Sequence, residues 1–222
     1  MQNLKENFLS IKKSLPENVK LIVVTKNQDT ERIKFLYDEG HRIFGENKVQ
    51  ELLTKKEKLP SDIEWHMIGH LQSNKVKYLT SFIGAIHSVD SFNLLKKIDK
   101  EAKNNSRKID CLLQLHIAME ETKFGFSMEE IIDMLDSAEF KQLANVKIAG
   151  FMGMATFTED DFIIRKEFKY LTNCFRSIKN KYFYNEIAFK ELSMGMSDDY
   201  KIALEEGSTM LRIGTLIFGE RR

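Results

Sequence analysis

Short apolar runs alternate with longer stretches of helical period along most of the chain. The runs are rich in branched and aromatic residues and are bounded by polar residues or glycine, which is typical of buried strands. Their starts lie about 20 to 40 residues apart, the length of a strand followed by a helix. The eight predicted strands are Lys20–Val24, His41–Phe44, Glu64–Ile68, Phe82–His87, Asp110–His116, Val146–Gly150, Glu186–Leu192 and Leu211–Phe218.

Polar capping residues mark the starts of predicted helices between these strands. Ser127 and Glu130 have the spacing of a capping box ahead of an apolar stripe. Glycine at the end of a helical pattern, as at Gly40, indicates where the helix stops. The expected helices are one that Thr30 caps and Gly40 closes, Phe92–Ala102 after Ser91, one after Ser127, Asp160–Ile178, and Asp198–Glu206 before Gly207.

Strict alternation of strands and helices favours a parallel α/β architecture. Eight such units in 222 residues predict a single (β/α)8 TIM barrel, and a doubly wound open sheet is the alternative. The chain has no internal repeat, no linker and only two prolines, Pro16 and Pro60, to mark a boundary. We therefore expect one domain over residues 1–222.

Composition narrows the classes of partner. The 34 basic and 33 acidic residues leave a formal charge of +1, so we expect neither nucleic acid nor a membrane surface as a partner. The longest aliphatic run, Leu21–Val24, is far too short to span a bilayer, and the first 20 residues lack the apolar core of a signal peptide. Cys111 and Cys174 fit neither a disulfide framework nor a metal site. We expect a cytoplasmic protein.

Polar side chains follow the first two predicted strands. Lys26 comes directly after Val24, and a lysine at the carboxyl end of a barrel strand points into the mouth, where partial burial favours the neutral amine. Such an amine is suited to forming an imine with an aldehyde, but on this feature alone an ordinary solvated lysine is the favoured interpretation. Asn47 follows the second strand and either caps the next helix, as Gly45 can, or offers its amide to a ligand.

Two histidines lie four residues apart, His66 within the predicted third strand and His70 just after it. If the first lies on a strand and the second in a turn, they share no helical face, and no cysteine or carboxylate nearby completes a ligand set. The HExxH arrangement is also absent. We interpret them as packed or hydrogen-bonding histidines rather than as metal ligands.

The last two strands end in residues that can hold a phosphate. Ser197 offers a hydroxyl at a helix start, Gly214 allows close backbone approach, and Thr215 adds an amide and a hydroxyl. A capping serine and a turn glycine explain each piece separately, but phosphate sites recur after strands 7 and 8 of barrels. With an imine-forming Lys26, this placement indicates a phosphorylated aldehyde, and pyridoxal 5′-phosphate (PLP) is the leading candidate.

These segments also resemble a known family, the pyridoxal phosphate homeostasis proteins, which are single-domain relatives of the alanine racemase barrel. The resemblance runs in order from about residue 20 to the C-terminus. The segments that carry it are Val24–Lys26, Phe44–Asn47, Trp65–Lys75, Leu192–Asp199, Gly207–Thr209, Arg212–Thr215 and Phe218–Arg221.

The resemblance implies a role for each matching residue. Lys26 would form the internal aldimine with PLP, and Arg212 would approach the pyridine nitrogen. Asn47 is expected near the cofactor, and Lys123 is at most a secondary contact. The residues that would bind the phosphate are Ser197, Gly214 and Thr215.

The chain departs from the family at two positions in the loop after Lys26. Gln28 stands where members often have a second lysine, and Asp29 stands at a frequent proline position. Any role of that second lysine in loading or releasing PLP is therefore in doubt for this chain.

Two functions from different classes follow. In the first, the protein binds PLP as a Schiff base for intracellular PLP homeostasis, either only limiting the free aldehyde or also delivering PLP to apo PLP-dependent enzymes, and has no turnover of its own. In the second, it is a PLP-dependent amino-acid racemase. Alanine racemases add a β-rich domain that supplies the second acid/base group across a dimer. Only four residues follow the last predicted strand here, so we expect neither this domain nor its dimer. We therefore favour a monomer. A barrel aldolase or phosphatase acting on a sugar phosphate is a third alternative.

Overall fold

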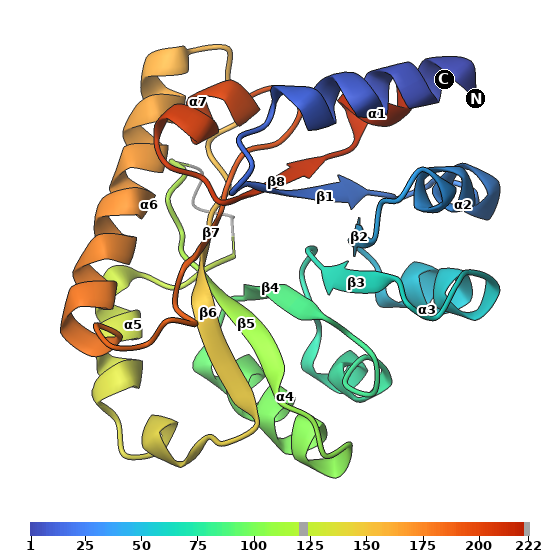
Figure 1. Ribbon diagram of the computed structural model, residues 1–222. Helices are drawn as coiled ribbons and strands as arrows, with labels where there is room; N and C mark the ends of the chain where they lie inside the picture. The colour runs from blue at the N-terminus through green and yellow to red at the C-terminus, as the bar shows by residue number, and fades with distance from the viewer. Residues whose placement is uncertain (120–123, 220–222) are drawn as a thin grey trace.

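Eight parallel strands close into a barrel in the order of the sequence in the computed structural model, which describes residues 1–119 and 124–219 (Figure 1). The predicted (β/α)8 barrel is confirmed, and the open-sheet alternative is wrong. The strands are β1 (Lys20–Val24), β2 (Ile43–Glu46), β3 (Glu64–Met67), β4 (Ala85–Val89), β5 (Ile109–Gln114), β6 (Val146–Met152), β7 (Glu191–Ser193) and β8 (Met210–Ile213).

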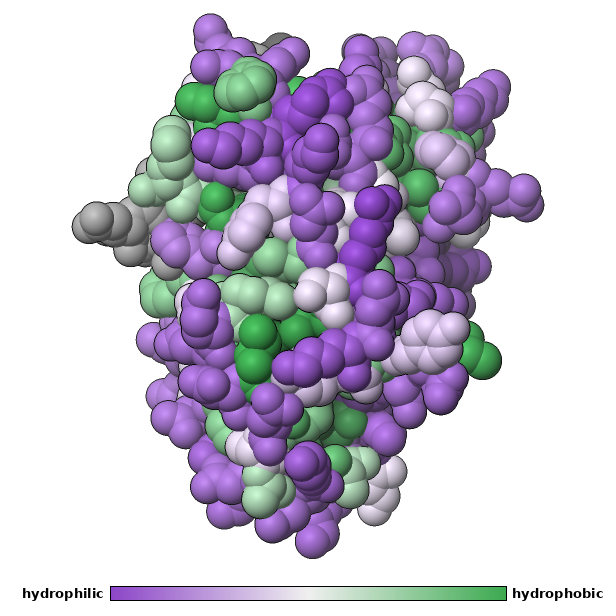
Figure 2. Space-filling model, turned by 90° about the vertical axis from the view of Figure 1, so that its left-hand side faces the viewer, coloured by the Kyte–Doolittle hydropathy of each residue, from purple (hydrophilic) through white to green (hydrophobic). Residues whose placement is uncertain are grey.

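Helices surround the barrel, and α6 runs along one whole side of it (Figure 1). The face that this side presents is mostly hydrophilic, with hydrophobic side chains scattered across it (Figure 2). None of the helices in the described residues has the length and apolar character needed to cross a membrane. The helices are α1 (Gln2–Ser14), α2 (Thr30–Asp38), α3 (Val49–Lys58), η1 (Ser73–Tyr78), α4 (Phe92–Asn104), α5 (Met128–Asp136), η2 (Phe140–Gln142), α6 (Asp161–Tyr182), α7 (Tyr200–Glu205) and α8 (Thr215–Phe218).

Side-chain caps fix several helix starts. Ser91 caps α4, and Ser127 with Glu130 forms the predicted capping box at α5, with both of its hydrogen bonds present. The cap of α2 was predicted one residue too late, because the Asp29 carboxylate, not Thr30, accepts the hydrogen bond from the amide of Arg32 at 2.8 Å. Asp29, which stands where family members often have proline, therefore caps helix α2.

At three places the structure differs from what the sequence predicted. The predicted strand Leu211–Phe218 ends at Ile213, because Gly214 turns the chain and α8 begins at Thr215. The predicted strand Glu186–Leu192 is strand only from Glu191. Helix α1 was not expected; its sparse apolar residues Leu4, Phe8 and Ile11 form one buried stripe. These few apolar residues are enough to hold the helix in place, because their stripe packs against the barrel.

Two hydrophobic cores lie on either side of the strands. The larger one fills the space between the barrel and the helices, and the smaller one fills the barrel interior with residues such as Ile22, Leu112 and Met152. Alternation along each strand sends successive side chains to opposite sides. Residues at the strand ends that face inward therefore line the two mouths of the barrel.

His41 belongs to the outer core, where helix α1 covers it. Its ring lies edge-on to Phe8 and Phe44, with centroids 5.4 and 5.0 Å away, and its Nε2–H donates to the carbonyl of Ile43 at 2.7 Å. Burial lowers the pKa of His41 to about 4, and the charges of Lys12 and Arg42 act in the same direction. The imidazole is therefore neutral in the folded protein at neutral pH.

This burial predicts a loss of stability in mild acid. Below its ordinary pKa the unfolded chain binds a proton at His41 that the folded chain does not, so stability falls as the pH drops from about 6.5 towards 4. We expect His41 to contribute a loss of about 2 kcal/mol between pH 7 and pH 5. Urea unfolding at both pH values measures it, and His41→Gln should show a drop smaller by that amount. Equal drops in the two proteins would contradict the prediction.

Candidate functional site

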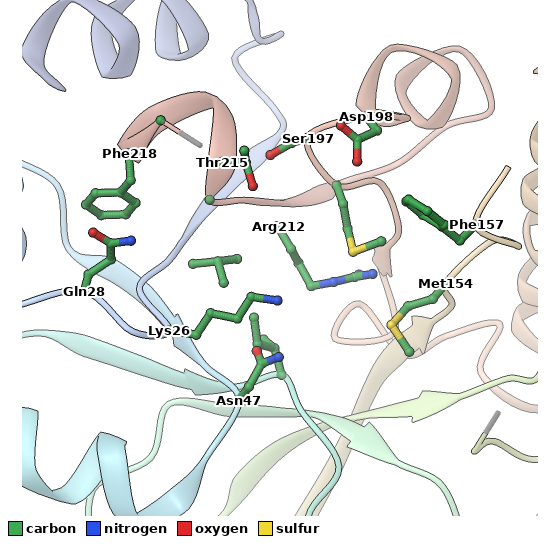
Figure 3. Close-up of a pocket in the computed structure, with 15 residues that line it drawn as sticks. Lys26, Gln28, Asn47, Met154, Phe157, Ser197, Asp198, Arg212, Thr215 and Phe218 are labelled. Carbon is green, nitrogen blue, oxygen red and sulfur yellow. The ribbon is translucent and has the colours of Figure 1, made fainter. Parts of the chain in front are cut away.

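A cavity of about 260 Å³ opens at the mouth formed by the carboxyl ends of the strands (Figure 3). It brings together residues from the ends of β1, β2 and β8 and from the loops that follow β6 and β7. All six residues singled out from the sequence line it: Lys26, Asn47, Ser197, Arg212, Gly214 and Thr215. Their binding roles remain predictions, but their predicted proximity is confirmed.

Lys26 and Arg212 extend towards the middle of this pocket (Figure 3). Ser197 and Thr215 lie together on one side of them, and Asn47 lies on the opposite side. The pocket therefore has an amine and a guanidinium at its centre and hydroxyl groups along one wall, a suitable set for a ligand that carries both an aldehyde and an anion.

The residues on either side of Lys26 are fixed by a buried ion pair beneath the loop. The ammonium of Lys55, on α3, donates hydrogen bonds of 2.6 Å to the carbonyl of Thr25 and to the carboxylates of Glu46 and Glu51. The backbone amide of Asn27 donates a hydrogen bond of 2.5 Å to the carboxylate of Glu51. Asn27 itself has a φ of 60°, in the left-handed region. The backbone before and after the site lysine is thus held by one side-chain cluster.

Glu46 is the member of that cluster whose charge is least well compensated. Its side chain is fully buried, and burial raises the pKa of the carboxyl group, while hydrogen bonds from Lys55 and Thr25 act in the opposite direction. One carboxylate oxygen, Oε2, has no hydrogen-bond partner among the described residues. The cluster therefore depends on Lys55, because an unpaired buried carboxylate is costly.

Ser197 and Gly214 bring together the two loops that were predicted to bind phosphate. The hydroxyl of Ser197 accepts a hydrogen bond of 3.3 Å from the amide of Leu216, in the first turn of α8. A Cβ added at Gly214 would lie 3.2 Å from the carbonyl of Val24, so glycine permits the close approach of β8 to β1. These contacts connect the loop after β7 with the turn after β8.

One detail of the predicted phosphate site is wrong. The helix after β7 was expected to begin at Asp198, with Ser197 at its start, but α7 begins at Tyr200 with Asp199 as its N-cap. The carboxylate of Asp199 accepts a hydrogen bond of 2.6 Å from the amide of Met196. Ser197 thus lies in a loop and faces the start of α8 instead.

Arg212 is almost fully buried, with 4% of its surface exposed. Its Nη1 donates to the carbonyl and the hydroxyl of Ser193 at 2.8 and 2.7 Å, and Nη2 donates to the carbonyl of Gly153 at 3.1 Å. Burial lowers the pKa of Arg212 to about 10, and the nearby charge of Asp199 opposes this change. The guanidinium remains a cation at neutral pH.

The two histidines of the third strand region lie in separate environments. His66 is buried inside the barrel and hydrogen-bonds to His87, whereas His70 is bonded to Asp90 at 2.8 Å and stacks on Phe124. The interpretation as packed or hydrogen-bonding histidines is confirmed. Within residues 1–119 and 124–219, no group of three or more potential metal-ligating side chains comes together. Lys123 lies outside the described residues.

Apolar walls were missed by the sequence analysis. Met154 and Phe157 lie together at one end of the pocket, and Phe218 lies at the other end beside Gln28 (Figure 3). The position of Met154 just after a predicted strand was a signal that this side chain is near the mouth. Nothing local marks Phe157 as a lining residue, because it comes from the loop between β6 and α6.

The buried ion pair generates a prediction. Lys55→Met should lower the free energy of unfolding by about 3–5 kcal/mol, because it leaves the carboxylate of Glu46 buried and without its cation. The double variant Lys55→Met/Glu46→Gln should recover at least half of that loss, since no buried charge remains. Denaturant unfolding of the three proteins measures both effects.

Lys34→Met is the matched control for that series. Lys34 also pairs with a carboxylate, that of Asp38, but both side chains are about half exposed. Its loss should change the free energy of unfolding by less than about 1 kcal/mol. Equal costs for Lys55→Met and Lys34→Met would mean that the cluster beneath Lys26 is not a buried ion pair in solution.

Comparisons with known proteins agree with this architecture. The alanine racemase N-terminal domain family matches residues 1–222. The pyridoxal phosphate homeostasis protein of Aquifex aeolicus is 40% identical over 91% of this chain and 87% of its own. That of Helicobacter pylori strain 26695 is 39% identical over 91% and 88%.

Solved structures share this fold. PipY of Synechococcus elongatus PCC7942, whose structure has PLP bound, is 33% identical with a TM-score of 0.87, covering 97% of this chain and 100% of its own. An alanine racemase of Clostridium difficile, 17% identical with a TM-score of 0.75, shares the fold over all of this chain and 56% of its own. With its full-length match to the racemase domain family and its 40% identity to a curated relative, the chain belongs to the pyridoxal phosphate homeostasis protein family.

Proposed function

We propose that this protein binds PLP in the pocket at the carboxyl-terminal mouth, attaches it covalently to Lys26 and holds it without turnover. The observation that carries the proposal is the convergence of Lys26, Arg212 and the Ser197–Thr215 pair on one cavity. The PLP-bound structure of PipY, which is 33% identical over 97% of this chain, supports the choice of ligand.

The residues present match the parts of PLP. PLP supplies an aldehyde; the Lys26 amine adds to the aldehyde carbon and water leaves, so the attachment requires no oxidant or reductant. The hydroxyls of Ser197 and Thr215 suit the phosphate, and Gly214 lets the backbone approach it. Ile68 and Met154 offer apolar surface to the ring.

Arg212 sets the chemistry at the other end of the ring. Three of its five N–H groups donate to Ser193 and Gly153, and the other two have no acceptor among the described residues. These two can donate to the pyridine nitrogen, but a guanidinium does not give up its proton. The bound ring is then a weaker electron sink than one protonated by a carboxylic acid, which favours storage of PLP over carbanion chemistry.

The racemase alternative requires an acid/base group on each face of the substrate. Of the residues that line the pocket in the described part of the chain, Lys26 can serve one face, while Asp198 is the only carboxylate. His66, His70 and Tyr200 are absent from that lining. The arrangement supports a protein that holds PLP, and apo PLP-dependent enzymes are the recipients that such a function implies.

Substitution of Lys26 tests the attachment. After incubation with PLP and borohydride reduction, peptide mapping by mass spectrometry should find the pyridoxyl mass on Lys26, and Lys26→Ala should lose that adduct. The free energy of unfolding of the apo-protein should change by less than about 1 kcal/mol, because Lys26 is only half-buried.

Lys48→Ala is the control for lysine modification at the mouth. Lys48 is exposed, follows Asn47 and does not line the pocket, so its loss should leave the adduct on Lys26 unchanged. Full labelling of Lys26→Ala at another lysine would overturn the assignment of Lys26. Absence of any adduct on the wild-type protein would overturn the proposed function itself.

The phosphate contacts give a separate prediction. Ser197→Ala and Thr215→Val should each weaken PLP binding by about tenfold or more, the effect of losing a hydrogen bond to a charged group. Pyridoxal, which lacks the phosphate, should be affected much less by either change. Fluorescence titration of both ligands measures the ratio, and equal losses for PLP and pyridoxal would count against these hydroxyls as phosphate contacts.

A further inference from the structure

A row of polar side chains crosses the hydrophobic interior of the barrel behind Arg212. The hydroxyl of Ser193, on β7, lies 2.7 Å from Nη1 of Arg212 and 2.9 Å from Nδ1 of His87, on β4. Nε2 of His87 lies 2.9 Å from Nδ1 of His66, and Nε2 of His66 lies 2.9 Å from the carboxylate of Glu64, both on β3. The row thus runs from the pocket to the amino-terminal end of β3.

The direction of these hydrogen bonds follows from Arg212, which is a donor only. Its N–H donates to the Ser193 oxygen, which leaves the Ser193 hydrogen to donate to Nδ1 of His87. His87 therefore carries its proton on Nε2 and donates to His66, whose own Nε2–H donates to Glu64. The opposite direction would leave the fully buried hydroxyl hydrogen of Ser193 without an acceptor, at a cost of about 1–3 kcal/mol.

Opposite charges stand at the two ends of the row. Burial holds the pKa of His87 well below its ordinary value, and the charges of Arg212 and Lys20 act in the same direction, so His87 is neutral. At the far end the hydrogen bond from His66 lowers the pKa of Glu64, and burial opposes this change. A cation at the pocket is thereby connected through neutral groups to a carboxylate at the opposite mouth.

The buried positive charge of Arg212 needs stabilisation by neighbouring polar groups. In the described part of the chain no carboxylate forms an ion pair with it, although it is 4% exposed. Every group in the row turns a lone pair towards the guanidinium, so the dipoles add in the direction that stabilises a positive charge. A carboxylate bound directly to Arg212 would do the same but would occupy the N–H groups that face the ligand.

We propose that Ser193, His87, His66 and Glu64 are positioning residues for Arg212. Through hydrogen bonds that all point the same way, they keep its charge and orientation while two N–H groups stay available for a ligand acceptor. The consequence for ligand binding rests on the proposed function, in which that acceptor is the pyridine nitrogen of PLP. The row itself exists independently of PLP.

The first experiment uses the apo-protein, so that it does not depend on PLP. Nitrogen-15 NMR of the histidine rings at about pH 7 should show both His66 and His87 as neutral rings with the proton on Nε2. In Ser193→Ala, His87 loses the donor to its Nδ1, and its ring should no longer be held in a single tautomer. A charged His87, or one protonated on Nδ1 in the wild-type protein, would overturn the proposal.

The second experiment measures PLP affinity. Ser193→Ala should weaken PLP binding by about tenfold, the effect of one hydrogen bond to a charged group. Ser88→Ala is its control: Ser88 is buried next to His87 on β4 and donates to the carbonyl of Gly69 at 2.6 Å, outside the row. That variant should stay within about twofold of wild type.

Glu64→Gln tests the far end without risk to folding, because its side chain is 52% exposed. It should weaken PLP binding measurably, by about threefold, since a neutral amide replaces the anion at the end of the row. Affinity at the wild-type level in both Ser193→Ala and Glu64→Gln would overturn the proposal. If the wild-type protein itself bound no PLP, the proposed function would fail, while the histidine tautomers would still decide whether the row exists.

Discussion

Hydrogen bonds between β1 and β8 bring the two ends of the chain together, and the pocket exists only because of them. Lys20 to Val23 pair in register with Met210 to Ile213, which closes the barrel. Closure places Lys26, at the end of the first strand, beside Gly214 and Thr215, at the end of the last. Parallel strands present all their carboxyl ends at one mouth, so the amine and the residues proposed to bind phosphate meet there although they are far apart in sequence.

Closure of the barrel brings the pocket residues together, and buried charged groups fix the positions of Lys26 and Arg212 within the pocket. The cluster of Lys55 with Glu46 and Glu51 fixes the backbone on both sides of Lys26, and a guanidinium, Arg212, is held from behind by polar groups inside the barrel. Buried charges add little net stability, because their desolvation costs about as much as their attraction returns. Their presence at two places around one pocket indicates that position, rather than stability, is what they provide.

The fold and most of the pocket were predictable from the sequence because both depend on local patterns. Apolar runs at strand-plus-helix spacing gave eight strands, and the capping box at Ser127 was visible as two residues. The break at Gly214 was missed, because the apolar character continues into α8 and conceals the change of period. The pairings of Lys55 with Glu46 and of His66 with His87 were not predictable, because they depend on which helix packs on which strand and on the register between β3 and β4.

The same interior bears on the proposal that this barrel holds a cofactor without turnover. Turnover at a pyridoxal ring benefits from an acid that protonates the ring nitrogen and from proton donors on both faces of the substrate. Here Arg212, the group proposed to meet the ring nitrogen, is a cation, and the carboxylate of Glu64 lies at the far end of the row of side chains behind it. The two histidines of that row lie buried beneath Arg212 and are not among the residues that line the pocket. Under the proposed function, the row stabilises the charge of Arg212 and places neither histidine against the ligand.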